Sequence, residues 1–86
     1  MKIDEIRPEV IEFAKSMESI LQFNDFKYGW ETMSKKELII KISKHFNKLL
    51  SLTLSFDDSL SNAEISKECI HISNYLMFLF NNTRGK

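Results

Sequence analysis

Apolar residues recur at spacings of three and four positions in three separate segments, which is the pattern of a helix with one apolar face. In the first segment these residues are Ile6, Val10, Phe13, Met17, Ile20 and Leu21. Pro8 suits the first turn of a helix, where its missing N–H is not needed. We predict a helix of about four turns that ends near Phe23. A loop of about ten residues follows, because Asn24, Asp25 and Gly29 favour turns.

Two capping boxes predict where the next helices begin. Ser34 and Ser61 each stand three residues before a glutamate, Glu37 and Glu64, and such pairs satisfy backbone donors at a helix start. The second helix has an apolar face that fades over residues 53–58, and residues 56–61 are predicted to be a connection. Its face is Leu38, Ile42, Phe46 and Leu49, widened by Ile39 and Leu50. The third helix, capped at Ser61, has the apolar stripe Ile65, Cys69, Ile72, Leu76 and Leu79. We expect this second stripe to be the seam of a bundle, and residues 81–86 to fray as a polar tail.

These patterns predict an all-α chain of three helices that forms one domain over residues 1–86. The third helix is also apolar on its other faces, at Ile70, Met77, Phe78 and Phe80, so it needs cover from more than one direction. A chain this short exposes much of its surface as a monomer. We therefore expect a homo-oligomer, a dimer or larger. Its core and subunit interface would contain Phe13, Met17, Phe46, Met77, Phe78 and Phe80.

Charge and cysteine content narrow the classes of function. Lys and Arg together number 12, as do Asp and Glu, so no net field attracts nucleic acid or an anionic membrane. The single cysteine, Cys69, has no partner for an internal disulfide, which fits a reducing compartment. The charged N-terminus lacks the apolar run of a signal peptide, and no stretch reaches the length of a membrane span. We expect a cytoplasmic protein with neither a nucleic-acid nor a membrane partner.

Three stretches of the chain together resemble one enzyme family. They are Glu9-Val10-x-x-Phe13-Ala14-x-x-Met17-Glu18, the loop Asn24-Asp25-x-Lys27-x-Gly29-Trp30, and residues 67–77, KECIHISNYLM. In order and spacing they resemble the dATP/dGTP pyrophosphohydrolase branch of the MazG-like all-α NTP pyrophosphatases. The loop is the most specific of the three, because helix packing does not require these residues there. The resemblance implies a helical bundle, usually dimeric, that cleaves a nucleoside triphosphate to the monophosphate and pyrophosphate.

The resemblance also implies a metal site that this chain has mostly lost. Family members hold Mg²⁺ with a Glu-x-x-Glu pair on one helix and a Glu-x-x-Asp pair on the facing helix. The matching positions here are His45 and Lys48, then Glu68 and His71, so one of four expected carboxylates remains. A lysine brings positive charge to the place of the cation and opposes its binding. We expect no catalytic residue and no cofactor, with hydrolysis absent or very weak.

The retained loop beside the altered site suggests a nucleotide-binding pseudoenzyme that sequesters a nucleotide or a nucleotide-derived signal. Lys48 would pair with Glu68 in the empty protein and with a phosphate in the complex. Loop residues would hold the base or ribose, and Tyr75 lies one turn after His71. The predicted nucleotide-binding residues are Asn24, Lys27, Trp30, Lys48, Glu68, His71, Asn74 and Tyr75.

Other interpretations of the same residues stay open. His45, Glu68 and His71 form a possible Zn²⁺ ligand set, although Lys48 opposes it. In a purely structural interpretation, the Lys48–Glu68 pair is an ordinary ion pair, Trp30 is a loop anchor and Asn24 is a helix cap. An active Mg²⁺-dependent pyrophosphohydrolase would need substitute carboxylates, for which the candidates are Glu37, Asp57, Asp58 and Glu64. A protein-interaction or inhibitory dimer is the remaining alternative.

Overall fold

The computed structural model describes residue 2 and residues 5–23, 30–54 and 58–84, with the backbone alone for 58–61. Over these ranges the chain is all-helical and has no strand. Three α-helices and one short 3-10 helix follow in the order α1 (Pro8–Phe23), η2 (Trp30–Thr32), α2 (Lys35–Thr53) and α3 (Asp58–Thr83). The predicted all-α class is confirmed. No helix within the described ranges combines the length and the apolar composition needed to cross a membrane.

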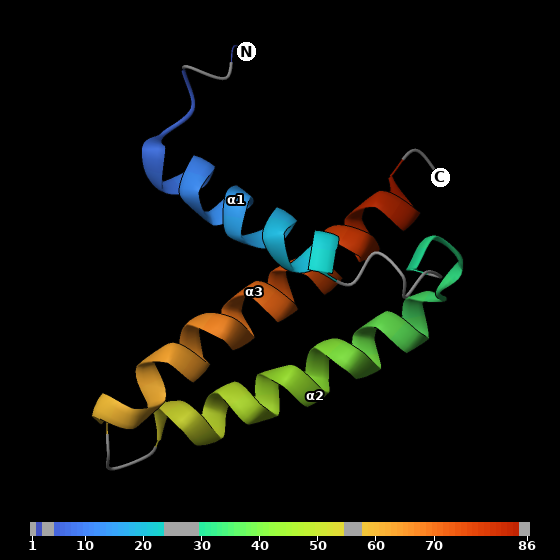
Figure 1. Cartoon of the computed structure of the whole chain (residues 1–86). Coiled ribbons are helices and arrows are strands. Elements are labelled where there is room, and N and C mark those ends of the chain that lie inside the picture. The colour runs from blue at the N-terminus through green and yellow to red at the C-terminus, as the bar shows by residue number, and fades with distance from the viewer. Residues whose placement is uncertain (1, 3–4, 24–29, 55–57, 85–86) are drawn as a thin grey trace.

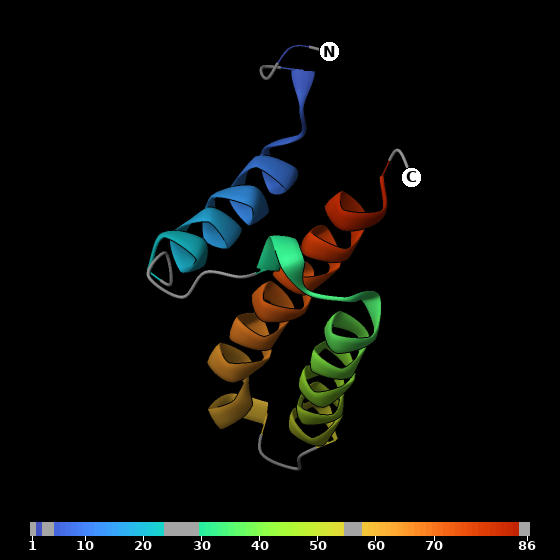
Figure 2. The same cartoon turned by 90° about the vertical axis from the view of Figure 1, so that its right-hand side faces the viewer.

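The helix α3 lies between the other two helices (Figures 1 and 2). It runs antiparallel to α2 and makes its most extensive contact with that helix, while α1 packs on another side of α3. The η2 turn also contacts α3. Because α3 touches every other described element, its faces determine what the fold can bring together.

The starts of α1 and α2 agree with the sequence prediction. In α1, the backbone N–H groups of Val10 and Ile11 donate to the Arg7 carbonyl at 3.0 and 3.1 Å, and Pro8 needs no donor in this turn. Ser34 caps α2 by accepting the Glu37 N–H with its Oγ at 3.1 Å. The Glu37 carboxylate lies 3.3 Å from the same hydroxyl and accepts a hydrogen bond from it. The predicted cap at Ser34 is therefore confirmed, whereas the Glu37 carboxylate bonds to the Ser34 hydroxyl and not to a backbone N–H group.

Both predicted ends of α3 are wrong, since the helix is longer than the apolar stripe within it. It begins at Asp58, inside the predicted connection 56–61, and not after a cap at Ser61. No Gly or Pro interrupts residues 58–65, and a helix once nucleated gains a hydrogen bond with each added residue. It also continues through Thr83 into the predicted polar tail. There the Thr83 hydroxyl donates to the Leu79 carbonyl at 2.8 Å, and Asn81 Nδ2 donates to the Met77 carbonyl at 3.0 Å.

The hydrophobic core of the described chain is very small. Only Leu38 of α2 and Phe78 of α3 are buried apolar residues there, and α1 buries no residue. Several positions of the predicted apolar faces are exposed in the single chain, namely Val10, Phe13, Ile39, Phe46, Leu50, Leu76 and Phe80. Much of each apolar stripe therefore has no cover within one copy of the chain.

The predicted seam of α3 is corrected in the same way. Leu76 is half exposed, whereas the side of α3 that meets α2 and η2 carries polar and aromatic residues spaced three and four apart. These are Glu68, His71, Tyr75, Phe78 and Asn82. Both oxygens of Glu68 are held from α2, so the face of Glu68 is the one that meets α2, while Ile65, Cys69, Ile72 and Leu79 of the apolar stripe are half-buried.

Candidate functional site

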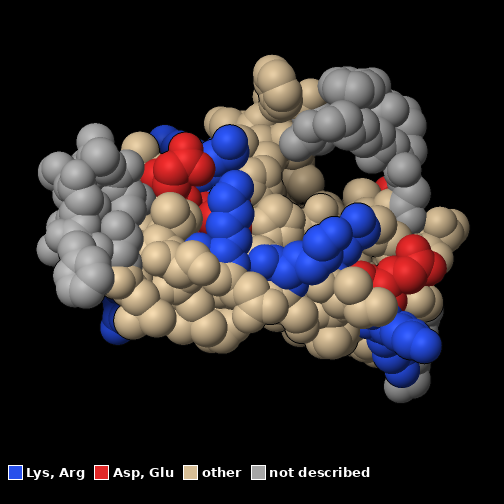
Figure 3. Space-filling view, turned by 90° about the horizontal axis from the view of Figure 1, so that it is seen from below, with Lys and Arg blue, Asp and Glu red and all other residues tan. Residues whose placement is uncertain are grey.

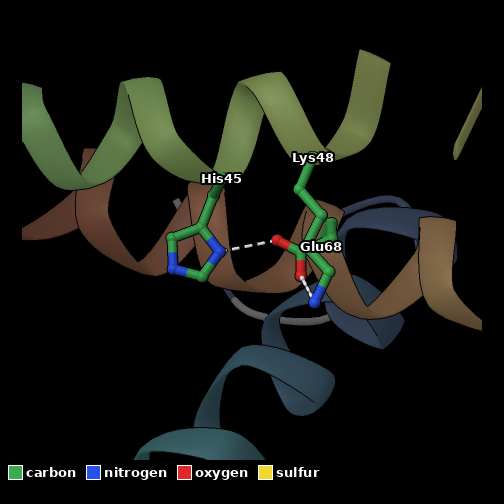
Figure 4. A network of polar contacts seen from close by, with 3 residues as sticks. All are labelled: His45, Lys48 and Glu68. Carbon is green, nitrogen blue, oxygen red and sulfur yellow. Dashed lines mark hydrogen bonds and ion pairs between the residues drawn. The ribbon is translucent and has the colours of Figure 1, made fainter. Parts of the chain in front are cut away.

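Glu68 is the centre of the candidate site. Its side chain is 1% exposed, although it carries a carboxylate. His45 and Lys48 reach it from the facing helix, as Figure 4 shows. His45 Nδ1 lies 2.6 Å from Oε2 and Lys48 Nζ lies 3.3 Å from Oε1. Each oxygen of the buried carboxylate thus has a partner on α2.

Spacing along the two helices explains this convergence. His45 and Lys48 are three residues apart and so share a face of α2, one turn from each other. The side chain of Lys48 is 55% exposed, because its long stem lets the amine reach Glu68 while the rest stays at the surface. Two donors from one helix therefore satisfy one carboxylate of the next, and α2 and α3 are joined by polar contacts at this point.

The pKa of Glu68 is lowered from its ordinary value of 4.5. Burial by itself raises this pKa, but the hydrogen bonds and positive charges supplied by His45 and Lys48 outweigh burial. Glu68 is therefore ionised at neutral pH and can only accept hydrogen bonds, so His45 presents a protonated Nδ1 to it. A carboxylate held in this way is a weak base.

His71 lies beside His45 and makes no hydrogen bond to Glu68. Its ring stacks on that of His45 with centroids 5.2 Å apart, and the ring of Tyr75 also stacks on His45, with centroids 5.4 Å apart. Burial, with the nearby charge of His45, lowers the pKa of His71 from its ordinary value of 6.5. The structure thus brings together His45, Lys48, Glu68, His71 and Tyr75 as one cluster.

Trp30 is placed as an anchor of η2. Its ring stacks on Phe78 at a centroid distance of 4.6 Å and an interplanar angle of 13°. The side-chain amide of Asn82 donates to the Trp30 carbonyl at 2.9 Å and to the Met33 carbonyl at 3.3 Å. One face of the indole is therefore occupied within the fold, which favours the anchor interpretation over base stacking on that face. Asn82 was not singled out from the sequence.

Asn74 contacts α1 and not the Glu68 cluster. Its Nδ2 donates to the Met17 carbonyl at 3.4 Å, and the side chain is buried. Its Oδ1 is buried without a hydrogen-bond partner in the described part of the chain. This contact makes Asn74 a link between α1 and α3.

Two more of the residues predicted to bind the nucleotide, Asn24 and Lys27 of the loop, lie outside the described residues. Asp57, one of the candidate substitute carboxylates, lies outside them as well.

The cluster does not fit a metal ion. Within the described ranges, no three His, Cys, Asp or Glu side chains are grouped so that they could hold one. His45, Glu68 and His71, the residues of the Zn²⁺ interpretation, are thus not grouped as ligands, and His45 Nδ1 contacts Glu68 Oε2 at 2.6 Å. Mg²⁺ prefers several oxygen ligands, yet both oxygens of Glu68 are engaged by nitrogen donors.

A small cationic pocket opens next to the cluster. It has a volume of about 320 Å³ and is lined by Lys41, Lys44, His45, Lys48 and Tyr75. Lys41 and Lys44 were missed at the sequence level. The signal that could have found them is their spacing, since Lys41, Lys44 and Lys48 are three and four residues apart and share one helix face.

Comparisons of the chain with protein-family models, with curated proteins and with solved structures each find no match.

Proposed function

We propose that this chain is a catalytically degenerate MazG-like protein that binds, and sequesters, a nucleotide or a nucleotide-derived signal without hydrolysing it. The supporting observation is the pair of nitrogen donors on Glu68, with Lys48 Nζ at 3.3 Å and His45 Nδ1 at 2.6 Å. In the family that the sequence resembles, these positions would carry carboxylates around Mg²⁺. Here a fixed ammonium group supplies the positive charge that attracts phosphate.

The same geometry argues against hydrolysis. Cleavage of a triphosphate needs a water molecule activated by a metal ion or by a base whose pKa lies near the operating pH. Glu68 is the one buried carboxylate in the described chain, and its lowered pKa makes it a poor base. Of the substitute carboxylates considered, Glu37 bonds to the Ser34 hydroxyl at the start of α2. Glu64 is exposed.

Calorimetric titration with a panel of linear and cyclic nucleotides tests the binding function. At least one nucleotide should bind the wild-type protein, and Lys48→Met should weaken that binding, because the variant loses the charge but keeps an apolar stem. Lys35→Met is the matched control, since it removes the same charge from the first turn of the same helix. If no nucleotide binds at high micromolar concentration, the proposed function is wrong.

A pyrophosphate-release assay separates this proposal from an active enzyme. We expect no release from nucleoside triphosphates with Mg²⁺ or Mn²⁺ above that of a Glu68→Gln variant, because the described site lacks a metal ligand set. Release that depends on metal and disappears in the variant would establish the enzyme alternative.

We also propose that the functional form is a dimer of this chain. Ile39, Phe46, Leu50 and Leu54 are all exposed and form a stripe along one side of α2. One copy buries only two apolar residues in its described part, which is little for a stable helical domain. A second copy can cover the stripe symmetrically, since the same patch then faces itself, and the balanced charge does not oppose association.

Sedimentation equilibrium tests the dimer. The wild-type protein should have twice the mass of one chain, and Phe46→Glu should shift it toward one chain by placing a charge in the stripe. Ser51→Glu adds the same charge to another exposed side of α2 and should leave the mass unchanged. A wild-type monomer at high micromolar concentration would exclude this interface.

A further inference from the structure

The pocket beside Glu68 combines three lysines from successive turns of one helix. Lys41, Lys44 and Lys48 point from the same side of α2, and Tyr75 closes the pocket from α3. Figure 3 shows that Lys or Arg side chains lie close together on one face of the molecule. The chain has equal numbers of basic and acidic residues, so this local positive charge comes from where the lysines lie in the fold and not from an excess of basic residues.

Two of the three lysine charges in this pocket, those of Lys41 and Lys44, are not neutralised by a neighbouring carboxylate among the described residues. No carboxylate lines it, and in the described part of the chain neither Lys41 nor Lys44 has an ion-pair partner. Glu68 pairs with Lys48 alone among the three lysines. Glu37 stands one turn before Lys41, but its carboxylate bonds to Ser34. Like charges on one helix face repel each other, and of the three only Lys48 is paired within the described ranges, so a ligand with several negative charges would relieve the repulsion.

The spread of the three lysines indicates the size of that ligand. Residues seven apart on a helix are separated by about 10 Å along its axis. Lysine ammonium groups are compact donors that suit phosphate oxygens. One phosphate group is short compared with this spacing, whereas a chain of linked phosphates can meet all three amines at once.

We infer that the pocket formed by Lys41, Lys44, His45, Lys48 and Tyr75 binds a chain of two or more linked phosphates, so that the ligand is a nucleoside diphosphate or triphosphate. This inference rests on the proposed nucleotide-binding function and places the phosphates of that ligand on the lysine face of α2. Lys41 and Lys44 then determine affinity for the phosphate chain, and Lys48 links the pocket to Glu68.

Inorganic triphosphate is the probe for this pocket, because it needs no base or ribose contact. Calorimetry would compare its binding, and that of orthophosphate, to the wild type and to the double variant Lys41→Gln/Lys44→Gln. The matched control is Lys35→Gln/Lys36→Gln, which removes two charges from the same helix outside the pocket. Melting temperatures would verify that both variants are folded.

The wild type should bind triphosphate at least about tenfold more tightly than orthophosphate. The pocket variant should lose on the order of tenfold in affinity for triphosphate, as expected for two partly exposed charge contacts. The control should change by less than about twofold. Equal losses in both double variants, equal binding of the two phosphates, or no binding of triphosphate would overturn the inference.

The two proposals fail in different ways. If nucleotides bind the wild type but triphosphate does not, and the pocket variant binds nucleotides normally, the pocket assignment is wrong and the nucleotide function stands. If triphosphate binds as described but no nucleotide binds more tightly than triphosphate itself, the pocket stands and the nucleotide function is wrong.

Discussion

At the scale of single residues, the buried carboxylate of Glu68 requires hydrogen-bond donors from the residues around it. A carboxylate with 1% exposure loses nearly all of its hydration, and this cost is offset only if both oxygens find donors. His45 and Lys48 supply those donors from the facing helix. The pair is therefore a requirement of the fold as well as the basis of the proposed site.

Glu68→Gln should reduce the free energy of unfolding at neutral pH by about 1–2 kcal/mol, a modest loss because both partners are partly exposed. Folding lowers the pKa of Glu68, so its stabilisation is complete above pH 4.5 and is lost as the pH falls through the folded value. Urea unfolding between neutral and acidic pH would measure this. The variant should lose less stability on acidification than the wild type, and parallel curves would contradict the expected linkage.

His71 contributes a second pH dependence with the same sign. Because folding lowers its pKa, protonation favours the unfolded chain, and stability should fall as the pH drops below 6.5. His71→Gln cannot take up this proton. Thermal unfolding at several pH values from 7.5 to 5 should show a smaller decrease for the variant. A decrease as large as in the wild type would mean that His71 is not the group responsible.

At the scale of secondary-structure elements, the sequence predicted helices better than it predicted which faces meet. The spacing of apolar residues and the Ser34 capping pair predicted α1 and the start of α2 correctly. The apolar stripe of α3 was expected to be the seam of the bundle, but the face of Glu68 and Phe78 is the one that meets α2 and η2. Hydrophobic periodicity could not predict that the Glu68 face is buried, because the periodicity considers apolar residues only and treats a carboxylate as exposed.

The candidate site was predicted in part for a related reason. The cluster of His45, Lys48, Glu68 and His71 came from a resemblance that fixed spacing along two helices, and spacing of three residues is enough to place side chains on one face. Contacts between distant segments carried no such signal. The stack of Trp30 on Phe78 and the bonds from Asn82 join residues about fifty positions apart, and only the fold reveals them.

The η2 turn is expected to depend on Trp30. Trp30→Ala should lower the free energy of unfolding by about 2 kcal/mol, because a half-buried aromatic stack is lost. Trp30→Phe keeps a ring on Phe78 and should restore most of that stability. If Trp30 is an anchor and not a base-stacking residue, nucleotide affinity should be the same in Trp30→Phe as in the wild type. A large loss of affinity in a stable Trp30→Phe protein would favour base stacking.

At the scale of the whole molecule, the sparse core links stability to association. With two buried apolar residues in its described part and apolar stripes left exposed, one copy has little to hold it together. In the dimer that we propose, stability depends on protein concentration. The melting temperature should therefore rise by several degrees over a hundredfold increase in concentration, and Phe46→Glu should abolish that rise. A melting temperature independent of concentration would contradict the dimer.

The most direct test of the central claim is the binding of a nucleoside triphosphate in the presence of excess chelator. Because Lys48 and its neighbouring lysines supply the positive charge, the affinity measured by calorimetry with EDTA should equal or exceed that measured with Mg²⁺. Binding that appears only when Mg²⁺ is added would contradict the claim that fixed cationic side chains have replaced the metal ion at this site.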